Sequence, residues 1–527
     1  MTTRRRETTD TYLSKIPLYG REEFAEAVSK TVIPEAPMAG DSAYRLISDE
    51  LLLDGRTGLN LATFVNTYED EWGLRLACDN LGKNFIDHEE YPAANLAEKR
   101  SIWMLAKELG TDFGKETDPD TAKGMYGSAT IGSSEAVMLG LIAHRYRWQQ
   151  QNAVNFDKGR ADAQDRPIVL MSAHVHTCWH KYCNYCNAMP LFVEIDKAPY
   201  TVSATTIAQI LDTKIEDKKS PYAAAVRNYM KYRSPQKNRT IGELVMAVGA
   251  VVGSTFTGNS DNVSKIGAAI DRYCAKPASK RLKLDIPIHV DAASAGFVLA
   301  FSKNGKAVPF DFNAAKRVKS INISNHKYGM SLPGMGSVIF RDAGVVDPSL
   351  VYDIRYLGGS FTDYTMNFSR GASMILLQYY NFLRFGRTGY ARIVDNCIHN
   401  ANAFLTAVNK NATLRPLFRN ISDIAHLPIV VLTFKSEKQR PSWTLTQLSD
   451  ELRMRGWIVP AYVLPKTSPE QVLTPSESLS VLRIVVQQKV SEDMLNMLVN
   501  DMATAVEKLA GTKDAAHTPP RFAGHRC

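Results

Sequence analysis

From Pro167 onward, short apolar runs that predict strands alternate with amphipathic segments that predict helices. The predicted strands cover 168–171, 191–195, 245–252, 287–290 and 321–324, and the predicted helices include 204–214 and 264–276. Strands separated by helices pair in parallel, because each helix carries the chain back to the starting edge of the sheet. We therefore predict an α/β fold with an open, mostly parallel sheet, whose functional residues lie at the carboxyl ends of the strands.

The pattern changes after about residue 364. Two bulky helices and a smaller α/β unit are predicted there: helices 371–385, 391–408, 444–455 and 491–509, and strands 429–434 and 479–486. At 527 residues the chain is long enough for more than one domain. We predict an N-terminal arm and helix (1–70), a large domain (71–364), a small C-terminal domain (365–511) and a disordered tail (512–527).

Lys327 follows a predicted strand directly and lies on a turn between two apolar segments. Most lysines are mobile surface charges, but the apolar neighbours draw this amine toward the interior. A desolvated amine loses its proton more readily and can then form a Schiff base with an aldehyde. The natural candidate is pyridoxal phosphate (PLP), which also requires a phosphate site and a carboxylate for its ring nitrogen.

A Gly/Ser loop with Gly132, Ser133 and Ser134 leads into an apolar helical pattern. Free N–H groups, serine hydroxyls and the positive end of the helix dipole together form an anion site. A serine at this place can equally be a plain helix N-cap. The loop by itself supports both interpretations.

Two charged residues lie in or directly after predicted strands. Asp291 follows strand 287–290, where a carboxylate either makes a structural hydrogen bond or keeps a pyridine nitrogen protonated. Arg483 lies inside the apolar strand 479–486. It is either an edge-strand residue that extends its charge to water or a clamp for an anion.

Charge and cysteine content exclude several classes of protein. The chain has 63 Lys and Arg against 54 Asp and Glu, a net charge of +9, with one basic concentration at 216–240. No nucleic-acid motif accompanies it, so we predict neither nucleic-acid nor membrane partners. The seven cysteines are thinly spread, no apolar signal region follows Met1, and the longest apolar run, 244–253, is too short to span a bilayer. We predict a cytoplasmic protein.

A cluster of histidines and cysteines at 174–186 suggests a metal or redox protein as a distant alternative. Cys183 and Cys186 have C-x-x-C spacing, and three histidines lie nearby. No second pair completes a tetrahedral zinc site, and we expect the cysteines to pack within a helix.

Taken together, the motifs resemble the PLP-dependent glutamate decarboxylases, within the group II amino-acid decarboxylase family. The similarity extends from about residue 40 to about residue 490 and includes N-L-A-T-F, N-F-I-D-H-E-E-Y-P, V-H-T-C-W-H-K and Y-L-G-G. It implies an aspartate-aminotransferase-like fold (PLP-dependent transferase type I) with a smaller C-terminal α/β domain. It also implies at least a homodimer, with a hexamer as the larger alternative. The implied reaction is a lyase reaction of glutamate metabolism, the decarboxylation of L-glutamate to 4-aminobutyrate (GABA) and carbon dioxide.

The resemblance further implies a role for each matched residue. Lys327 matches the Schiff-base lysine, His176 the residue that stacks on the ring, Asp291 the partner of the ring nitrogen, and Thr255 a residue that lines the cofactor site. The matched phosphate contacts are Ser133, Ser134, Ser324, His326 and, from the neighbouring subunit, Ser369. The pocket for the substrate's side-chain carboxylate is matched by Thr63, Phe64, Asn84 and Asp87, and Arg483 matches an arginine near the substrate carboxylate.

The sequence departs from the family pattern in three places. His176 occupies a position where bacterial and plant glutamate decarboxylases carry glutamine, so a decarboxylase of aspartate or of an aromatic amino acid stays an alternative. N-L-A-T-F and N-F-I-D favour a carboxylate over an aromatic ring. Segment 216–240 resembles an insertion, and the tail lacks the Trp-plus-basic helix of plant members, so calmodulin binding is not predicted.

Asp87 beside a substrate carboxylate would be a like-charge pair. We expect one of the two carboxyl groups to hold a proton in the complex. Turnover should therefore be favoured at acidic pH, and a pH–rate profile that is flat from acid to alkali would contradict this expectation.

Overall fold

The computed structural model describes residues 31–157, 159, 161–232, 238–303, 305–355, 361–436 and 440–511. The chain divides into two compact units, residues 1–56 and residues 57–527. The first unit contains the amphipathic helix α2 (Gly40–Leu51), none of whose residues is buried. The rest of the predicted arm, residues 1–30, lies outside the described residues, as do the predicted tail and the Y-L-G-G motif.

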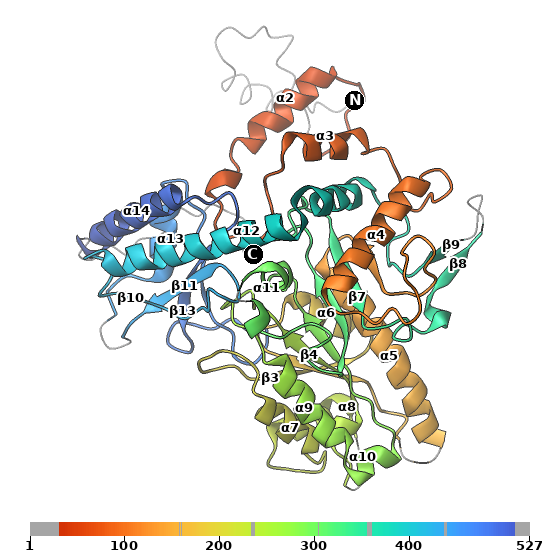
Figure 1. Ribbon diagram of the computed structural model, residues 1–527. Helices are drawn as coiled ribbons and strands as arrows, with labels where there is room; N and C mark the ends of the chain where they lie inside the picture. Colours follow the sequence, from red (N-terminus) through yellow and green to blue (C-terminus); the bar gives the residue numbers. More distant parts are fainter. Residues whose placement is uncertain are drawn as a thin grey trace, which may run out of the picture. The chain divides into compact units, whose positions relative to one another are not determined.

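The larger unit is built around a seven-stranded sheet (Figure 1) with the order β1-β7-β6-β5-β4-β2-β3. Its strands are β1 (Gly127–Thr130), β2 (Ile168–Ser172), β3 (Met189–Val193), β4 (Val245–Val251), β5 (Ile288–Asp291), β6 (Val318–Ile323) and β7 (Gly336–Phe340). Strands β2 to β6 pair in parallel, whereas β7 runs antiparallel to both β6 and β1. The predicted mostly parallel sheet is confirmed.

Helices lie before and between these strands in the chain. They are α3 (Glu71–Asp79), α4 (Pro92–Glu108), α5 (Ser133–Asp157), α6 (Thr177–Tyr185), α7 (Ala204–Asp212), α8 (Pro221–Met230), α9 (Val263–Cys274), α10 (Pro277–Arg281) and α11 (Gly296–Phe301). Helix α5 contacts β1 and each of β4 to β7. Its N-terminus therefore lies where it can serve a site at the edge of the sheet.

A second, antiparallel sheet follows in the order β10-β11-β13-β12. Its elements are β10 (Phe418–Asn420), β11 (Ile429–Phe434), β12 (Ala461–Val463) and β13 (Ser480–Val485), with helices α13 (Leu445–Arg453) and α14 (Glu492–Gly511) and a separate hydrophobic core. The seven-stranded sheet lies wholly before residue 364 and this sheet wholly after it. The exact domain boundaries stay a prediction.

The long element α12 (Ser373–Lys410) joins the regions that carry the two sheets. Gly386 interrupts it with φ 55° and ψ −176°, a conformation that glycine adopts without steric cost. Two helices therefore meet at this glycine, and two helices were predicted here. A short hairpin, β8 (Tyr352–Ile354) and β9 (Phe361–Asp363), precedes α12.

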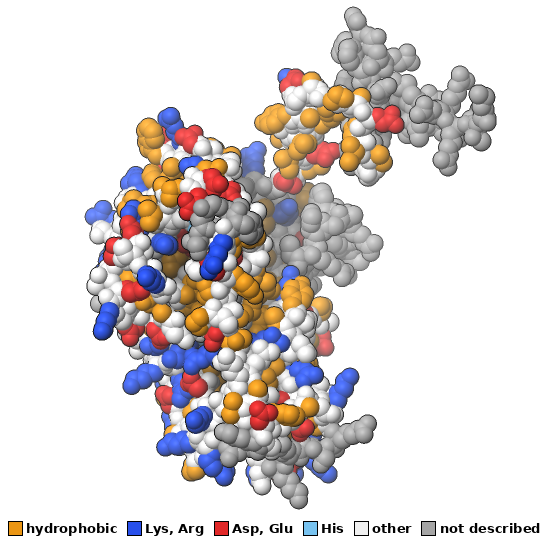
Figure 2. All heavy atoms as spheres, turned by 90° about the vertical axis from the view of Figure 1, so that its right-hand side faces the viewer, with side chains coloured by type: hydrophobic (Ala, Val, Ile, Leu, Met, Phe, Trp, Pro, Cys, Tyr) orange, Lys and Arg blue, Asp and Glu red, His pale blue; other side chains and the backbone are white. Residues whose placement is uncertain are grey.

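The surface carries no concentrated basic area on the face shown in Figure 2. Lys and Arg side chains are spread there among acidic and uncharged ones. This face therefore gives no indication of a large basic patch. In the described ranges, no helix is both long enough and apolar enough to cross a membrane.

Candidate active site

Lys327 lies on the turn after β6, at the carboxyl end of the parallel sheet. Its Nζ donates a hydrogen bond to Ser294 Oγ (2.9 Å) and lies 5.3 Å from the centre of the Phe64 ring. Burial lowers the pKa of this amine to about 8, although the charge of Asp291 opposes the shift. An appreciable fraction of the amine is therefore neutral near neutral pH, as its predicted role requires.

Asp291 is the last residue of β5 and is 6% exposed. Its Oδ2 accepts from Trp179 Nε1 (2.8 Å), and its Oδ1 accepts from Asn322 Nδ2 (2.9 Å) and from the backbone N–H of Ala293 (3.1 Å). A buried carboxylate is tolerated only when donors satisfy its oxygens, and here three do. An acceptor held in this way suits a protonated ring nitrogen.

The predicted anion site lies at the start of α5. Ser324 Oγ, on the turn after β6, donates to Ser133 Oγ (2.8 Å), so the helix start and the lysine turn share a hydrogen bond. Gly336 of β7 packs against the same place, since a Cβ there would lie 2.6 Å from the carbonyl carbon of Gly132. The close backbone approach and the hydroxyl contact between elements favour an anion site over a plain N-cap.

Two imidazoles border the same cavity. His176 caps α6, where its Nδ1 accepts from the backbone N–H of Cys178 (3.3 Å). Although the ring is exposed in the open cavity, the surrounding protein desolvates it and keeps its pKa below the usual range. His326 Nδ1 accepts from the Met335 N–H (3.3 Å), and burial lowers the pKa of His326 to about 4. Both rings are thus suited to contact a cofactor in their neutral form.

Arg483 lies in β13, between β11 and β12, so its interpretation as an edge-strand residue is wrong. Its guanidinium donates to the carbonyl oxygens of Thr255 (2.6 Å) and Ala62 (2.8 Å). It also packs over the rings of Phe64 (4.9 Å) and Tyr462 (5.6 Å). A guanidinium restrained by carbonyls and rings keeps its positive charge near the lysine, as an anion clamp would.

Eight of the predicted site residues line one cavity of about 260 Å³: Ser133, Ser134, His176, Thr255, Asp291, Ser324, His326 and Lys327. Phe64 and Arg483 adjoin this cavity through the contacts described above, and Thr63 directly precedes Phe64. These predicted residues, which lie far apart in the sequence, are thus brought together around one amine.

Asn84, Asp87 and Ser369 do not line this cavity. The Asn84 amide donates to the Asp87 carboxylate (3.3 Å) and accepts from the backbone N–H of Arg370 (3.2 Å). Ser369, next to Arg370, is exposed. The roles assigned to these three residues, and the acid pH preference argued from Asp87, stay predictions.

Three residues of the site were not predicted from the sequence. Ser294 holds the lysine amine, and Trp179 and Asn322 hold the Asp291 carboxylate. Ser294 lies three residues after Asp291 in a run of small residues, a signal that could have found it. Trp179 lies three residues after His176, which is a weaker signal.

The histidine and cysteine cluster at 174–186 has structural partners. Cys183 is buried within α6 in a hydrophobic cluster with Trp179, as predicted, whereas Cys186 lies just after the end of this helix and is only half-buried. His174 Nε2 donates to the carbonyl oxygen of Pro465 (2.9 Å), and His180 pairs with Glu470 (2.8 Å). Within the described ranges, no three His, Cys, Asp or Glu side chains are grouped to hold a metal.

The cavity fits PLP group by group. An amine faces it for the aldehyde, an acceptor-only carboxylate for the ring nitrogen, and a helix start with serine hydroxyls for the phosphate. The space is limited at the helix start, since a Cβ on Gly132 would lie 3.3 Å from His326 Cε1. This cavity at the carboxyl edge of a mostly parallel α/β sheet defines a PLP-dependent enzyme of fold type I.

The family model for the pyridoxal-dependent decarboxylase conserved domain matches residues 73–431, and the chain belongs to this family. The chain is 31% identical to a glutamate decarboxylase of Solanum lycopersicum over 94% of this chain and 85% of the relative. It is 31% identical to a probable glutamate decarboxylase gamma of Listeria monocytogenes, over 96% and 95%. PLP is accordingly the cofactor, and the protein is a PLP-dependent lyase.

Solved structures agree with this assignment. A glutamate decarboxylase of Lactobacillus brevis matches with a TM-score of 0.75 and 30% identity over 95% of this chain and 99% of that one. A structure titled as Oryza sativa TDC with PLP matches with a TM-score of 0.66 over 92% and 90%, at 16% identity. The second likeness concerns the fold alone.

Proposed function

We propose that this protein removes the α-carboxyl group of L-glutamate and releases GABA and carbon dioxide, with PLP joined to Lys327. The observation that carries this proposal is the similarity to glutamate decarboxylases over nearly the whole of both chains. The arginine restrained beside the lysine adds a physical reason, because it supplies a positive charge for an acidic substrate.

Bound PLP supplies an aldehyde for an amine and a ring that withdraws electrons from the substrate's Cα. Lys327 contributes a partly deprotonated amine, held by Ser294, and after exchange with the substrate amine it can return a proton to Cα. Asp291 keeps an acceptor at the ring nitrogen, and His176 offers a neutral face for stacking. These groups orient the substrate carboxylate for loss.

Arg483 and Phe64 form the part of the site that selects the substrate. The arginine is held by backbone carbonyls and two rings, so little side-chain entropy is lost when it binds an anion. Phe64, whose ring contacts both the lysine amine and the guanidinium, limits access of water to both groups. An acidic side chain fits this environment better than an indole or a phenol.

The reaction is tested by incubating purified, PLP-loaded protein with single amino acids and measuring carbon dioxide release. We expect release with L-glutamate and a much smaller rate with L-aspartate or aromatic amino acids. Faster turnover of an aromatic amino acid would overturn the assignment of glutamate while leaving the family assignment intact.

Replacement of Arg483 by glutamine is expected to raise the KM for glutamate about 10- to 100-fold, because a charge-assisted contact is lost. Arg341 provides a matched control, since its guanidinium also donates to backbone carbonyls, those of Val318 (2.6 Å) and Ala315 (2.6 Å). Arg341→Gln should leave KM within about twofold. Equal KM changes in the two variants would argue against a substrate contact.

Capture of PLP by the PLP-free protein should become faster as the pH rises through about 8. The amine of Lys327 is protonated below this pKa and neutral above it, and only the neutral amine attacks an aldehyde. Stopped-flow absorbance at a series of pH values measures the rate. A rate that keeps rising toward the ordinary lysine pKa would show that the amine is not desolvated.

We further propose that the protein acts as a homodimer at least, with Ser369 lent by the partner subunit to the phosphate. The exposed apolar side chains of Ile131 and Met366 support this proposal, because the backbone N–H groups of both bond to Glu135 (2.9 Å each), beside the helix start. Apolar surface at the mouth of a site favours cover by another chain.

Mixing inactive subunits tests this arrangement. Lys327→Ala and Ser369→Glu proteins, unfolded and refolded together, should recover about a quarter of the sites if the serine acts across a symmetric dimer. Each variant refolded alone is the control. No recovery, although light scattering shows mixed dimers, would contradict the lent serine.

We also propose a cytoplasmic location. The six described cysteines, at 78, 178, 183, 186, 274 and 397, are all unpaired thiols. Unpaired cysteines are typical of a reducing compartment. Fractionation of cells that express the protein tests this proposal.

A further inference from the structure

A chain of buried polar side chains extends from Asp291 into the protein, away from the cavity. Asn322, His289 and Ser320 are each 0% exposed, and His144 is 1% exposed. His289 lies 2.9 Å from Asn322 Oδ1 through Nε2 and 2.6 Å from Ser320 Oγ through Nδ1. His144 Nε2 lies 2.7 Å from the same hydroxyl. The residues therefore form one continuous hydrogen-bonded chain.

The register of the parallel sheet places these side chains together. Asp291 pairs with Asn322, and His289 pairs with Ser320, on neighbouring strands β5 and β6. Residues two apart on a strand point to the same face, so all four side chains share one face. Helix α5 covers it closely, since a Cβ on Gly140 would lie 2.4 Å from His289 Cε1.

The hydrogen bonds of this chain have only one consistent direction. The amide NH₂ of Asn322 donates to Asp291, so its oxygen faces His289 and His289 donates from Nε2. Nδ1 of His289 then accepts the single hydroxyl hydrogen of Ser320. The hydroxyl oxygen accepts in turn from His144 Nε2. Every hydrogen in the chain points toward Asp291.

Both histidines are neutral, which this direction requires. Burial lowers the pKa of His289 to about 4, although Asp291 opposes the shift, and burial lowers the pKa of His144 well below its usual range. A neutral imidazole has one donor and one acceptor nitrogen. A ring that donates a hydrogen bond from one nitrogen therefore accepts at the other, and it cannot donate to both neighbours.

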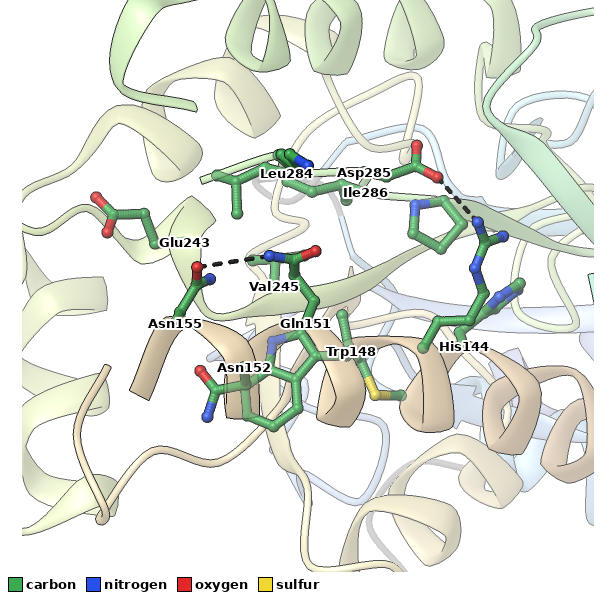
Figure 3. A pocket seen from close by; sticks show the side chains of 14 residues that line it. His144, Trp148, Gln151, Asn152, Asn155, Glu243, Val245, Leu284, Asp285 and Ile286 are labelled. Carbon is green, nitrogen blue, oxygen red and sulfur yellow. Dashed lines mark hydrogen bonds and ion pairs between the residues drawn. The ribbon is translucent and has the colours of Figure 1, made fainter. Parts of the chain in front are cut away.

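The end of this hydrogen-bonded series that is farthest from Asp291, His144, lies at a second cavity of about 110 Å³. Figure 3 shows His144, Trp148 and Gln151 along α5 at one wall of this cavity. In the described part of the chain, His144 Nδ1 has no hydrogen-bond partner. The hydrogen-bonded series thus ends at an acceptor nitrogen, as the donor-to-acceptor direction predicts. Among the described residues, no further hydrogen bond to Nδ1 orients the His144 ring.

We propose that His289 and Ser320 are positioning residues that hold the Asn322 amide with its NH₂ toward Asp291, so that Asp291 stays an acceptor for the ring nitrogen of PLP. Without His289, the Asn322 amide can turn its oxygen toward the carboxylate, and a donor is replaced by a second acceptor. The effect of a substitution on the contact between Asp291 and the ring nitrogen should become smaller along the hydrogen-bonded series, from Asn322 through His289 and Ser320 to His144. The inference rests on PLP as cofactor and not on the choice of amino-acid substrate.

The test compares PLP with 1-deaza-pyridoxal 5′-phosphate, in which a C–H replaces the ring nitrogen. Both are titrated into full-length protein freed of PLP, and the ratio of their dissociation constants is measured. Ser320→Ala and His289→Leu should weaken the binding of PLP, relative to the binding of the deaza compound, by about fivefold or more. His289→Gln, which keeps an N–H near Asn322, should restore most of the preference.

Thr433→Val is the matched control. Thr433 is 1% exposed and donates to the Ser480 carbonyl oxygen (2.8 Å) in the small sheet, so this variant also loses a buried hydrogen bond. Its ratio should equal that of the wild type. An equal loss of affinity for both compounds in Ser320→Ala, or no loss for either, overturns the proposal, because a purely structural role does not distinguish a nitrogen from a carbon.

Two further variants keep the test decisive. If Ser320→Ala does not fold, Ser320→Cys takes its place, because a thiol is nearly isosteric with the hydroxyl and is only a weak donor. It should shift the ratio of dissociation constants in the same direction, and an unchanged ratio would overturn the proposal. Asp291→Ala tests the premise, and it should itself remove the preference for PLP. If it does so and the chain variants do not, the premise survives and the positioning role is wrong.

Discussion

Alanine in place of Lys327 is expected to lower kcat by at least about a thousandfold and to remove the visible absorbance of bound PLP. Among the described residues that line the cavity, none but Lys327 is a lysine, and Ser294 and Phe64 contact its amine at the cavity wall. Absorbance spectra and carbon dioxide release measure the two effects. The folded state should be retained, since a buried amine that costs desolvation energy is removed.

Lys319→Ala is the matched control for this experiment. Lys319 lies on β6, is half-buried, and its pKa is also lowered by burial, yet it does not line the cavity. Its replacement should leave both the spectrum and kcat within about twofold of the wild type. Retained PLP absorbance in Lys327→Ala would mean that another residue carries the cofactor.

Asparagine in place of Asp291 is expected to lower kcat about 100- to 10,000-fold with little change in fold. The negative charge beside the ring nitrogen disappears, and the new NH₂ group meets donors that already point at this position, Trp179 Nε1 and Asn322 Nδ2. Both effects oppose a protonated ring. Steady-state kinetics with saturating PLP separates the loss of chemistry from a loss of cofactor.

Asp261→Asn controls for the loss of a buried carboxylate. Asp261 is 3% exposed and accepts from the backbone N–H groups of Val202 (2.7 Å) and Val251 (2.8 Å), outside the cavity. Burial raises its pKa to about 6. The variant should change the melting temperature and leave kcat within about twofold. A comparable loss of kcat in both variants would attribute the Asp291 effect to folding.

The central strands could be predicted because each is a buried run of apolar residues between amphipathic helices. Strand β1 could not, since Gly127–Thr130 has no apolar alternation and reads as part of the Gly/Ser loop. It is a strand only because it pairs with β7. Helix α8 does have a local start signal, because it begins at Pro221 and Ser220 caps it. It was missed because the basic composition of 216–240 suggested an insertion.

The candidate site shows the same division. Lys327 and Asp291 could be found because charged residues next to apolar strands demand an explanation. Asn322 carries no such signal, and Trp179 and Ser294 are marked only by their closeness in the sequence to His176 and Asp291. Each of the three bonds to a site residue that is distant in the sequence. The absence of Asn84 from the lining of this cavity was equally invisible, because a sequence motif does not state which cavity its residues face.

Arg483 joins three distant parts of the polypeptide, since it bonds to the carbonyls of Ala62 and Thr255. During synthesis from the N-terminus, the first two partners leave the ribosome long before β13 does. The part of the site that contains Arg483 is therefore completed only near the end of translation. A truncated product that lacks the last strands would contain Lys327 and the start of α5 but would lack Arg483.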